Sequence, residues 1–264
     1  MNKGVVSVLV AYLIWGLYPF YFHAMQHVAP TEIVIHRVLW TFALLAVYLF
    51  CSRRWRWIQK AITDRRTVAV FLMSSVLITA NWSTYTYAIV TNQTLEASLG
   101  YFMNPLVSVL LGTVFLKEKL NKAQMLAIVF ACAGVMWVTF KQGEFPALGL
   151  TLALSFGFYG LVRKMAPLGS LEGLTLETAF AFPVALLATF YFAGNGDLTF
   201  VHGTSWDKFW LIMAGPITTI PLILFAYGLK QVPYSTVGFI QYLSPTMVFL
   251  SGCSFLGKNC KLTA

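Results

Sequence analysis

Long apolar runs constrain this sequence more than any other feature. A helix that crosses a bilayer core of about 30 Å needs about 20 apolar residues, and runs of this kind recur along the whole chain. The sequence predicts nine membrane-spanning helices, at residues 4–22, 32–51, 68–90, 95–116, 123–140, 147–162, 172–192, 208–229 and 235–256. The segments between them are short, so we expect an all-α integral membrane protein without a separate water-soluble domain.

The composition agrees with a membrane protein and argues against a nucleic-acid partner. Only 10% of the residues are charged and 58% are hydrophobic, whereas a soluble domain carries about 25% charged residues. The net charge of +9 would by itself suit a nucleic-acid-binding protein, but Lys and Arg fall in the short segments between apolar runs. That placement is typical of membrane topology, so the expected partner is the lipid bilayer.

The basic residues also predict the orientation of the chain. Residues 52–67 hold six of the 18 Lys and Arg side chains, and alternation of the spans from there places 13 of the 18 on one side of the membrane. Positively charged loops remain in the cytoplasm, so this side and the N-terminus should be cytoplasmic. The first run lacks a small-residue cleavage site and is interpreted as a retained span of a multi-pass protein in the cytoplasmic membrane.

A shift of 140 residues relates the two halves of the chain. It aligns Tyr101 with Gln241 and Pro105 with Pro245, and it matches a pattern of Leu, Gly and Phe after each proline. Because five helices are an odd number, two successive five-helix units enter the membrane in opposite orientations. We therefore expect an inverted repeat, with one unit at residues 1–140 and the second at residues 147–264.

Six segments carry a further resemblance: residues 12–20 (YLIWGLYPF), 32–40 (EIVIHRVLW), 81–88 (NWSTYTYA), 95–105 (LEASLGYFMNP), 176–186 (LETAFAFPVAL) and 241–246 (QYLSPT). Together they resemble the EamA-like branch of the drug/metabolite transporter superfamily. The resemblance implies a ten-helix fold of two inverted five-helix repeats. It also implies an efflux permease that moves small organic molecules or metabolites by alternating access, without a cofactor.

The end of the sequence departs from this family pattern. The family typically has Gly-Glu at the end of the ninth helix and then a tenth helix, whereas this sequence has Gly257 and Lys258, followed by six residues. The resemblance thus predicts a chain that lacks its tenth helix and has little activity. A second copy of the chain, in a homodimer, is a candidate to cover the surface left exposed.

Two repeat-related prolines lie near the middle of the fourth and ninth runs. Pro105 follows Asn104, and Pro245 follows Ser244. A proline removes a hydrogen bond within its helix and frees a carbonyl group, which needs a protein partner or a water-filled cavity at the depth of the bilayer core. The prolines therefore predict broken helices around a central site, although ordinary packing kinks are the alternative.

Polar and aromatic residues at similar depth are candidates for the lining of that site. Amides and phenols donate and accept hydrogen bonds, and aromatic faces stack on organic solutes and attract cations. Such a set suits an amphipathic or cationic organic solute, although helix–helix packing uses the same residue types. The candidates are Trp15, Tyr18, Asn81, Trp82, Tyr85, Tyr101, Asn104, Gln241 and Tyr242.

Four ionisable residues are candidates for gating or coupling. Arg37 is costly inside a membrane and should face protein or water, or else extend to the interface. The adjacent His36 also suits a hydrogen-bonded packing position, and Glu96 is either a proton-coupling carboxylate or a helix-start acid favoured by the helix dipole. Glu177 aligns with Arg37 at the repeat offset, but the opposed helix directions place the two near opposite membrane faces, so we expect each to have a different partner.

No motif in the sequence predicts an enzyme or a metal site. The sequence lacks HExxH, paired Asp-rich motifs and suitably spaced Ser/His dyads, so a membrane-embedded enzyme and a non-transporting membrane protein remain only as alternatives to a transporter. The four cysteines show no CxxC or Cys/His spacing, and we expect neither disulfides nor a bound metal.

Overall fold

The computed structural model describes residues 2–53, 55–91, 93–142 and 145–247, and within them all regular structure is helical. The all-α membrane fold expected from the sequence is confirmed. The end of the ninth run and the tail, on which the missing tenth helix was predicted, lie outside the described residues. The helices are α1 (Lys3–Gly16), α2 (Tyr18–Ala24), α3 (Pro30–Ser52), α4 (Arg56–Thr63), α5 (Arg65–Val90), α6 (Thr94–Phe115), α7 (Lys122–Gln142), α8 (Ala147–Met165), α9 (Ser170–Gly194), α10 (Thr199–His202), α11 (Ser205–Leu229) and α12 (Tyr234–Gln241).

Within the described part of the chain, seven helical segments are long and apolar enough to cross a membrane. One of them joins α1 and α2, which are separated only at Leu17, and the others are α3, α5, α6, α7, α9 and α11. The sixth expected span, α8, is not among the seven, because its last turn carries Arg163 and Lys164. It nevertheless packs in the interior, where Tyr159 and Arg163 are among the most deeply buried side chains.

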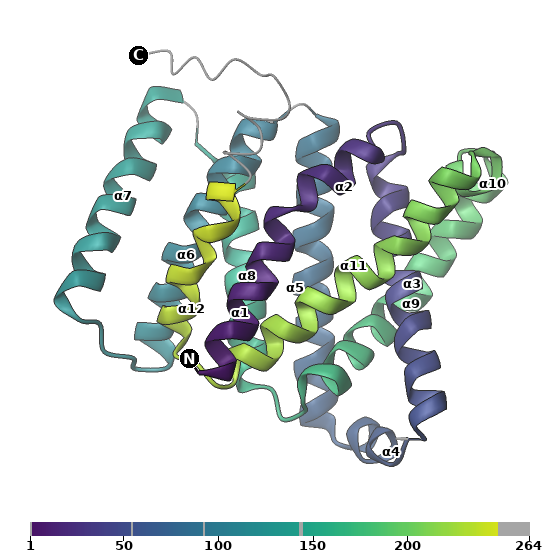
Figure 1. Cartoon of the computed structure of the whole chain (residues 1–264), viewed down its shortest axis with the longest axis horizontal. Coiled ribbons are helices and arrows are strands. Elements are labelled where there is room, and N and C mark those ends of the chain that lie inside the picture. The colour runs from purple at the N-terminus through teal and green to yellow at the C-terminus, as the bar shows by residue number, and fades with distance from the viewer. Residues whose placement is uncertain (1, 54, 92, 143–144, 248–264) are drawn as a thin grey trace.

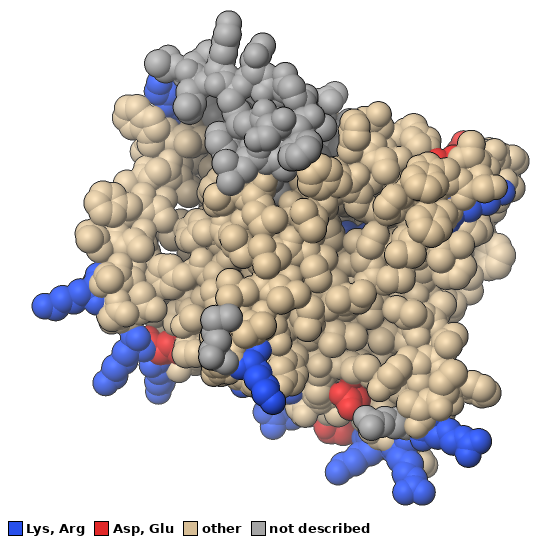
Figure 2. Space-filling view, viewed as in Figure 1, with Lys and Arg blue, Asp and Glu red and all other residues tan. Residues whose placement is uncertain are grey.

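The two ends of the helices differ in charge. Figure 1 places the N-terminus and α4 at one end, and α2 and α10 at the other. The Lys and Arg side chains gather along the end that carries α4 (Figure 2). The exposed basic residues on and around α4 are Arg53, Arg56, Lys60, Arg65 and Arg66.

The α4 helix was not expected, because its segment was interpreted as a connecting loop. Its apolar residue Ala61 is buried in a cluster with Phe71 of α5 and Leu176 of α9. The helix therefore folds back against the ends of two neighbours while its basic residues stay in contact with water. This contact anchors the most basic segment of the chain at one end of the bundle.

Glycines bring helices unusually close together. A Cβ atom on Gly100 of α6 would lie 2.8 Å from the carbonyl oxygen of Gly149 in α8, and a Cβ atom on Gly215 of α11 would lie 2.7 Å from the backbone of Trp40 in α3. In a bilayer, small residues at such crossings allow the van der Waals contact that holds helices together. These crossings bring α6 to α8 and α3 to α11 around the centre of the molecule.

The α7 helix stands apart from the rest at one edge of the molecule (Figure 1). None of the residues in its most apolar stretch is buried, whereas half of the corresponding stretch is buried in both α6 and α11. The interior of the described protein is therefore built without α7, and the exposed apolar surface of this helix suits lipid.

The expectation of a broken helix at Pro105 is wrong. The α6 helix continues through this proline from Thr94 to Phe115, since a proline removes only the hydrogen bond of its own nitrogen and the other bonds of a long helix remain. Other prolines lie inside α9 and α11 as well. The second half differs, because α12 ends at Gln241 and a turn at Tyr242 separates it from the short helical segment that contains Pro245.

Candidate functional site

A cavity of about 430 Å³ lies between helices from both halves of the chain. Helices α1, α2, α3, α5 and α6 form most of its wall, and α8, α11, α12 and the residues that follow α12 complete it. Its surface is mainly aromatic and apolar with a few polar groups, which is typical of small-molecule sites. The lining residues are Tyr12, Trp15, Tyr18, Pro19, Phe22, Arg37, Ile78, Asn81, Trp82, Tyr85, Ala97, Ser98, Tyr101, Phe102, Asn104, Phe156, Leu222, Gln241, Ser244 and Pro245.

The structure gathers most of the candidate lining residues in this one cavity. Two additional candidates lie there as well: Pro245, expected at a helix break, and Arg37, expected at a gate. The candidates found in the lining are Trp15, Tyr18, Asn81, Trp82, Tyr85, Tyr101, Asn104 and Gln241.

Tyr242 was also expected in the lining, and the structure corrects this assignment. Gln241 lines the cavity but Tyr242 does not, because successive residues of a helix point about 100° apart and α12 ends between the two. Pro105 is likewise buried outside the lining. His36, Glu96 and Glu177 occupy three other places in the fold.

His36 packs at the junction of α3 and α10. Its Nδ1 accepts a hydrogen bond from the indole of Trp40 at 3.0 Å, and its ring lies 4.7 Å from that of Phe200. Its Nε2 is 3.9 Å from a carboxylate oxygen of Glu32. These contacts correspond to the packing role that was one of its two interpretations.

Acidic residues of the described chain cap the N-termini of neighbouring helices. Glu96 of α6 accepts a hydrogen bond from the backbone N–H of Leu148 at 3.2 Å, at the start of α8. Glu118 accepts from the N–H groups of Tyr234 at 2.6 Å and Ser235 at 2.8 Å, at the start of α12. Because a carboxylate near a helix N-terminus is favoured by the helix dipole, Glu96 has a structural role at this junction.

The amides in the cavity wall also hold helices together. Asn81 donates to the carbonyl oxygen of Leu152 at 3.0 Å. In the amide orientation that matches its neighbouring donors and acceptors, the nitrogen of Asn104 donates to the same carbonyl at 3.3 Å. Gln241 accepts a hydrogen bond from Ser108 at 3.1 Å. The polar part of the wall is thus fixed in place by α8 and α6, which favours a preformed site.

Arg37 is the charged group of the described lining. Its Nε donates to the hydroxyl of Thr218 at 2.9 Å, and its guanidinium carbon lies 4.2 Å from the centre of a Trp82 ring and 6.0 Å from that of Tyr18. Its exposed fraction is only 8%. A cation over the face of Trp is attracted by the ring electrons, most strongly where water is excluded.

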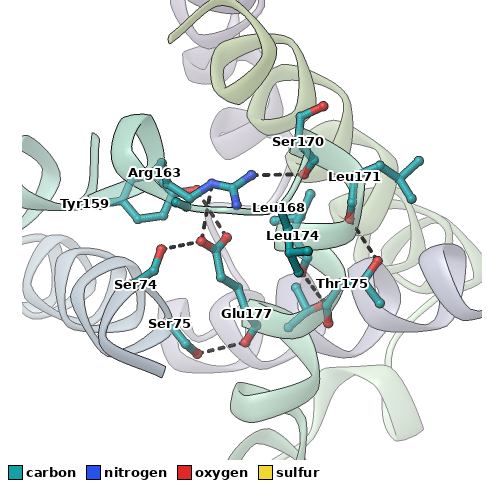
Figure 3. A network of polar contacts seen from close by, with 12 residues as sticks. Ser74, Ser75, Tyr159, Arg163, Leu168, Ser170, Leu171, Leu174, Thr175 and Glu177 are labelled. Atoms are coloured by element: carbon teal, nitrogen blue, oxygen red, sulfur yellow. Dashed lines mark hydrogen bonds and ion pairs between the residues drawn. The ribbon is translucent and has the colours of Figure 1, made fainter. Parts of the chain in front are cut away.

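A second buried arginine, Arg163, lies outside the cavity in a network of polar contacts (Figure 3). Its Nε is 3.4 Å from a carboxylate oxygen of Glu177, which also accepts hydrogen bonds from the hydroxyls of Ser74 and Tyr159. Its Nη2 donates to the carbonyl of Ser170 at 2.9 Å. Arg37 and Glu177 therefore have different partners, as expected. The ion pair of Glu177 joins α8 to α9, and the hydrogen bond from Ser74 adds α5.

Ten lining residues were not proposed from the sequence: Tyr12, Pro19, Phe22, Ile78, Ala97, Ser98, Phe102, Phe156, Leu222 and Ser244. The repeat offset contained a signal for two of them, because Leu222 aligns with Trp82 and Ser244 aligns with Asn104. The other eight lie on helix faces that we did not distinguish from ordinary packing faces in the sequence. Among the residues that the structure describes, no group of three His, Cys, Asp or Glu side chains is placed to hold a metal ion.

A helical membrane protein with an aromatic cavity lined by both halves of its chain has the architecture of a solute transporter. The sequence matches the EamA-like transporter family over residues 2–140. The chain belongs to this family, which confirms the resemblance seen in its motifs.

Curated relatives match almost the full length of the chain. The uncharacterized transporter YojE of Bacillus subtilis is 41% identical and covers 95% of this chain, which in turn covers 85% of that protein. Protein RarD of Escherichia coli is 38% identical, with 98% of this chain and 87% of that protein covered. A crystal structure that is 15% identical, and covers 94% of this chain and 88% of its own, has the same fold with a TM-score of 0.67.

Proposed function

We propose that this protein exports small organic molecules across the cytoplasmic membrane by alternating access to the 430 Å³ cavity. The observation that carries the proposal is the symmetry of the lining. Trp82 and Leu222, Tyr101 and Gln241, and Asn104 and Ser244 are pairs related by the 140-residue offset, and all six residues line the cavity. A solute held between two related units becomes accessible from either side when one unit moves against the other.

The positions of the connecting helices support two inverted repeats, at residues 1–140 and 147–264. The α4 helix connects the second and third long helices of the first unit, and α10 connects the corresponding helices of the second unit. These equivalent connections lie at opposite ends of the molecule (Figure 1), as expected for units of opposite orientation. The basic end that contains α4 is proposed to face the cytoplasm together with the N-terminus.

A flux assay in proteoliposomes tests this function. The full chain should give saturable flux of labelled aromatic solutes, with no new chemical product. Trp82→Ala, in the cavity wall, should raise the apparent KM, whereas Trp206→Ala is a matched control because this tryptophan is 60% exposed and lies outside the cavity. Equal effects of the two substitutions, or product formation without flux, would contradict the proposal.

An unbiased comparison of metabolites between cells is needed to identify the natural substrate. Metabolites in the medium and inside the cells should be profiled with and without the protein, under otherwise identical conditions. Export predicts compounds that are depleted outside and accumulate inside when the protein is absent. The opposite distribution would reverse the proposed direction.

A further inference from the structure

We infer that the cavity selects organic anions that carry an aromatic or apolar body, and that Arg37 recognises their negative group. This inference rests on the transport function proposed above and names the substrate class of the same site. Within the described lining, Arg37 is the residue with a formal charge, and the other side chains are aromatic, apolar or neutral and polar. The cavity therefore presents one positive group to a solute.

The charge of Arg37 is not compensated by the protein around it. None of the ion pairs within the described residues involves Arg37, and its hydrogen-bond partner Thr218 is neutral. The three buried carboxylates of the described residues have other contacts, since Glu32 binds the start of α10, Glu177 binds Arg163, and Asp207 binds His27 and Thr204. An unpaired buried cation is unfavourable, so an anion that enters the cavity relieves this unfavourable state and accepts charge-assisted hydrogen bonds.

The same geometry disfavours organic cations, which the sequence alone had suggested as substrates. The face of tryptophan is the strongest aromatic surface for a cation, and the Trp82 face already holds the Arg37 guanidinium at 4.2 Å. A second cation would also be repelled by Arg37, because charges interact strongly where water is excluded. The rings of Trp15 and Phe156, with centres 5.8 Å apart, remain as a surface for the apolar body of the solute.

Arg37 also lies between this cavity and a second one. The second cavity, of about 200 Å³, is lined by residues of α2, of α3, of the segment between them and of α5. The two cavities share Phe22, Arg37 and Tyr85. Arg37 therefore contributes to the wall of both cavities, and its charge acts on a solute in either one.

Matched probes that differ only in charge test the inference. Proteoliposomes with the full chain should be assayed with 1-naphthylacetate, 1-naphthylacetamide and 2-(1-naphthyl)ethylamine, and with the three phenyl counterparts. Because a hydrogen bond to a charged group is worth more than one to a neutral group, the carboxylates should have an apparent KM about 10-fold lower than the amides. The amines should be transported least.

Substitutions then assign the preference to Arg37. Arg37→Gln should abolish the preference for carboxylates and leave transport of the amides, whereas Arg37→Lys should weaken the preference severalfold, because an ammonium lacks the planar fork of a guanidinium. Lys141→Gln is the matched control. Lys141 also lies over a tryptophan, 5.6 Å from the Trp137 ring, but outside the cavity, so the preference should not change.

The outcomes separate this inference from the proposed function. Saturable flux without a charge preference, a preference for amines, or a preference that survives in Arg37→Gln would overturn the anion assignment while transport stands. Failure of every probe to give saturable flux, both with this chain and with a chain extended by a family-like tenth helix, would count against transport itself. If Arg37→Gln does not fold, Arg37→Lys decides, and an unchanged preference in that variant overturns the assignment.

Discussion

Two buried arginines show how the environment of one side chain type sets its role. Arg163 is 1% exposed and lies 3.4 Å from the carboxylate of Glu177. Arg37 is 8% exposed, and its described contacts are the hydroxyl of Thr218 and aromatic rings such as that of Trp82. Both guanidinium groups are removed from water, but only one has a carboxylate partner.

A buried charge that has a partner of opposite sign stabilises the structure, whereas a buried charge without such a partner is available to a ligand. Arg163 and Glu177 compensate each other's charge and join α8 to α9, so neither charge is left for a solute. Arg37 is held in place by neutral groups, and its charge remains to act on the cavity. A buried arginine without an acidic partner is unfavourable for folding, and a function in solute recognition explains its presence.

Breaking the buried ion pair should have the largest effect. Arg163→Ala leaves the carboxylate of Glu177 buried without its cation, which should destabilise the folded protein by about 3–5 kcal/mol. Thermal unfolding of the purified protein in detergent measures the loss. The double substitution Arg163→Met with Glu177→Leu should lower the unfolding free energy by less than the sum of the losses caused by the two single substitutions. If the losses were strictly additive, the two residues would not be energetically coupled.

Removal of the other arginine should have a much smaller effect on stability. Arg37→Met loses a hydrogen bond and the contact with Trp82, but it also removes an uncompensated charge, so the unfolding free energy should stay within about 1 kcal/mol of the wild type. The same thermal measurement compares it directly with Arg163→Ala. Equal destabilisation by both substitutions would remove the distinction between the two arginines.

Thr218→Val should change how Arg37 is oriented without removing its charge. Loss of the hydroxyl that accepts from Nε should reduce the preference for carboxylates by about 3-fold to 10-fold, because a hydrogen bond to a charged group is lost. The neighbouring Thr219→Val is the control, since Thr219 bonds to Thr41 and to the carbonyl of Gly215 instead. A change in preference in the control variant alone would contradict the role of Thr218.

The smallest effect is expected at an exposed charge, Asp64 before α5. Hydrogen bonds, first from the hydroxyl of Thr67 and also from backbone N–H groups, lower the pKa of Asp64 below its usual value of 3.8. A folded-state pKa below the unfolded one adds stability above the unfolded pKa, and this stability is lost as the pH falls through the folded pKa. Asp64→Asn should therefore be slightly less stable than the wild type at neutral pH, and the difference should vanish in acid; a constant difference in thermal unfolding at all pH values would rule out this origin.

Much of the cavity could be predicted from the sequence, because depth in a span and the repeat offset are both read along the chain. Asn104, Tyr101 and Gln241 all lie at mid-span, and all line the cavity. The prediction for Tyr242 was wrong because the direction of its side chain depends on where α12 ends, and the depth of a residue in a span does not specify that end. Phe156 was missed because the apolar run at 147–162 does not show which of its faces meets the cavity, and only the packing of α8 against its neighbours turns this residue toward it.

Apolar run length and motifs are properties of the chain as written, and they were enough to predict a helical membrane protein of the EamA-like transporter family. The partner of each charge, in contrast, follows from the way the helices pack. Glu96 meets the start of α8 and Glu177 meets Arg163, while Arg37 is left facing the cavity. Interactions between charges depend on distances set by helix packing, and residues far apart in the sequence are brought together only when the helices assemble.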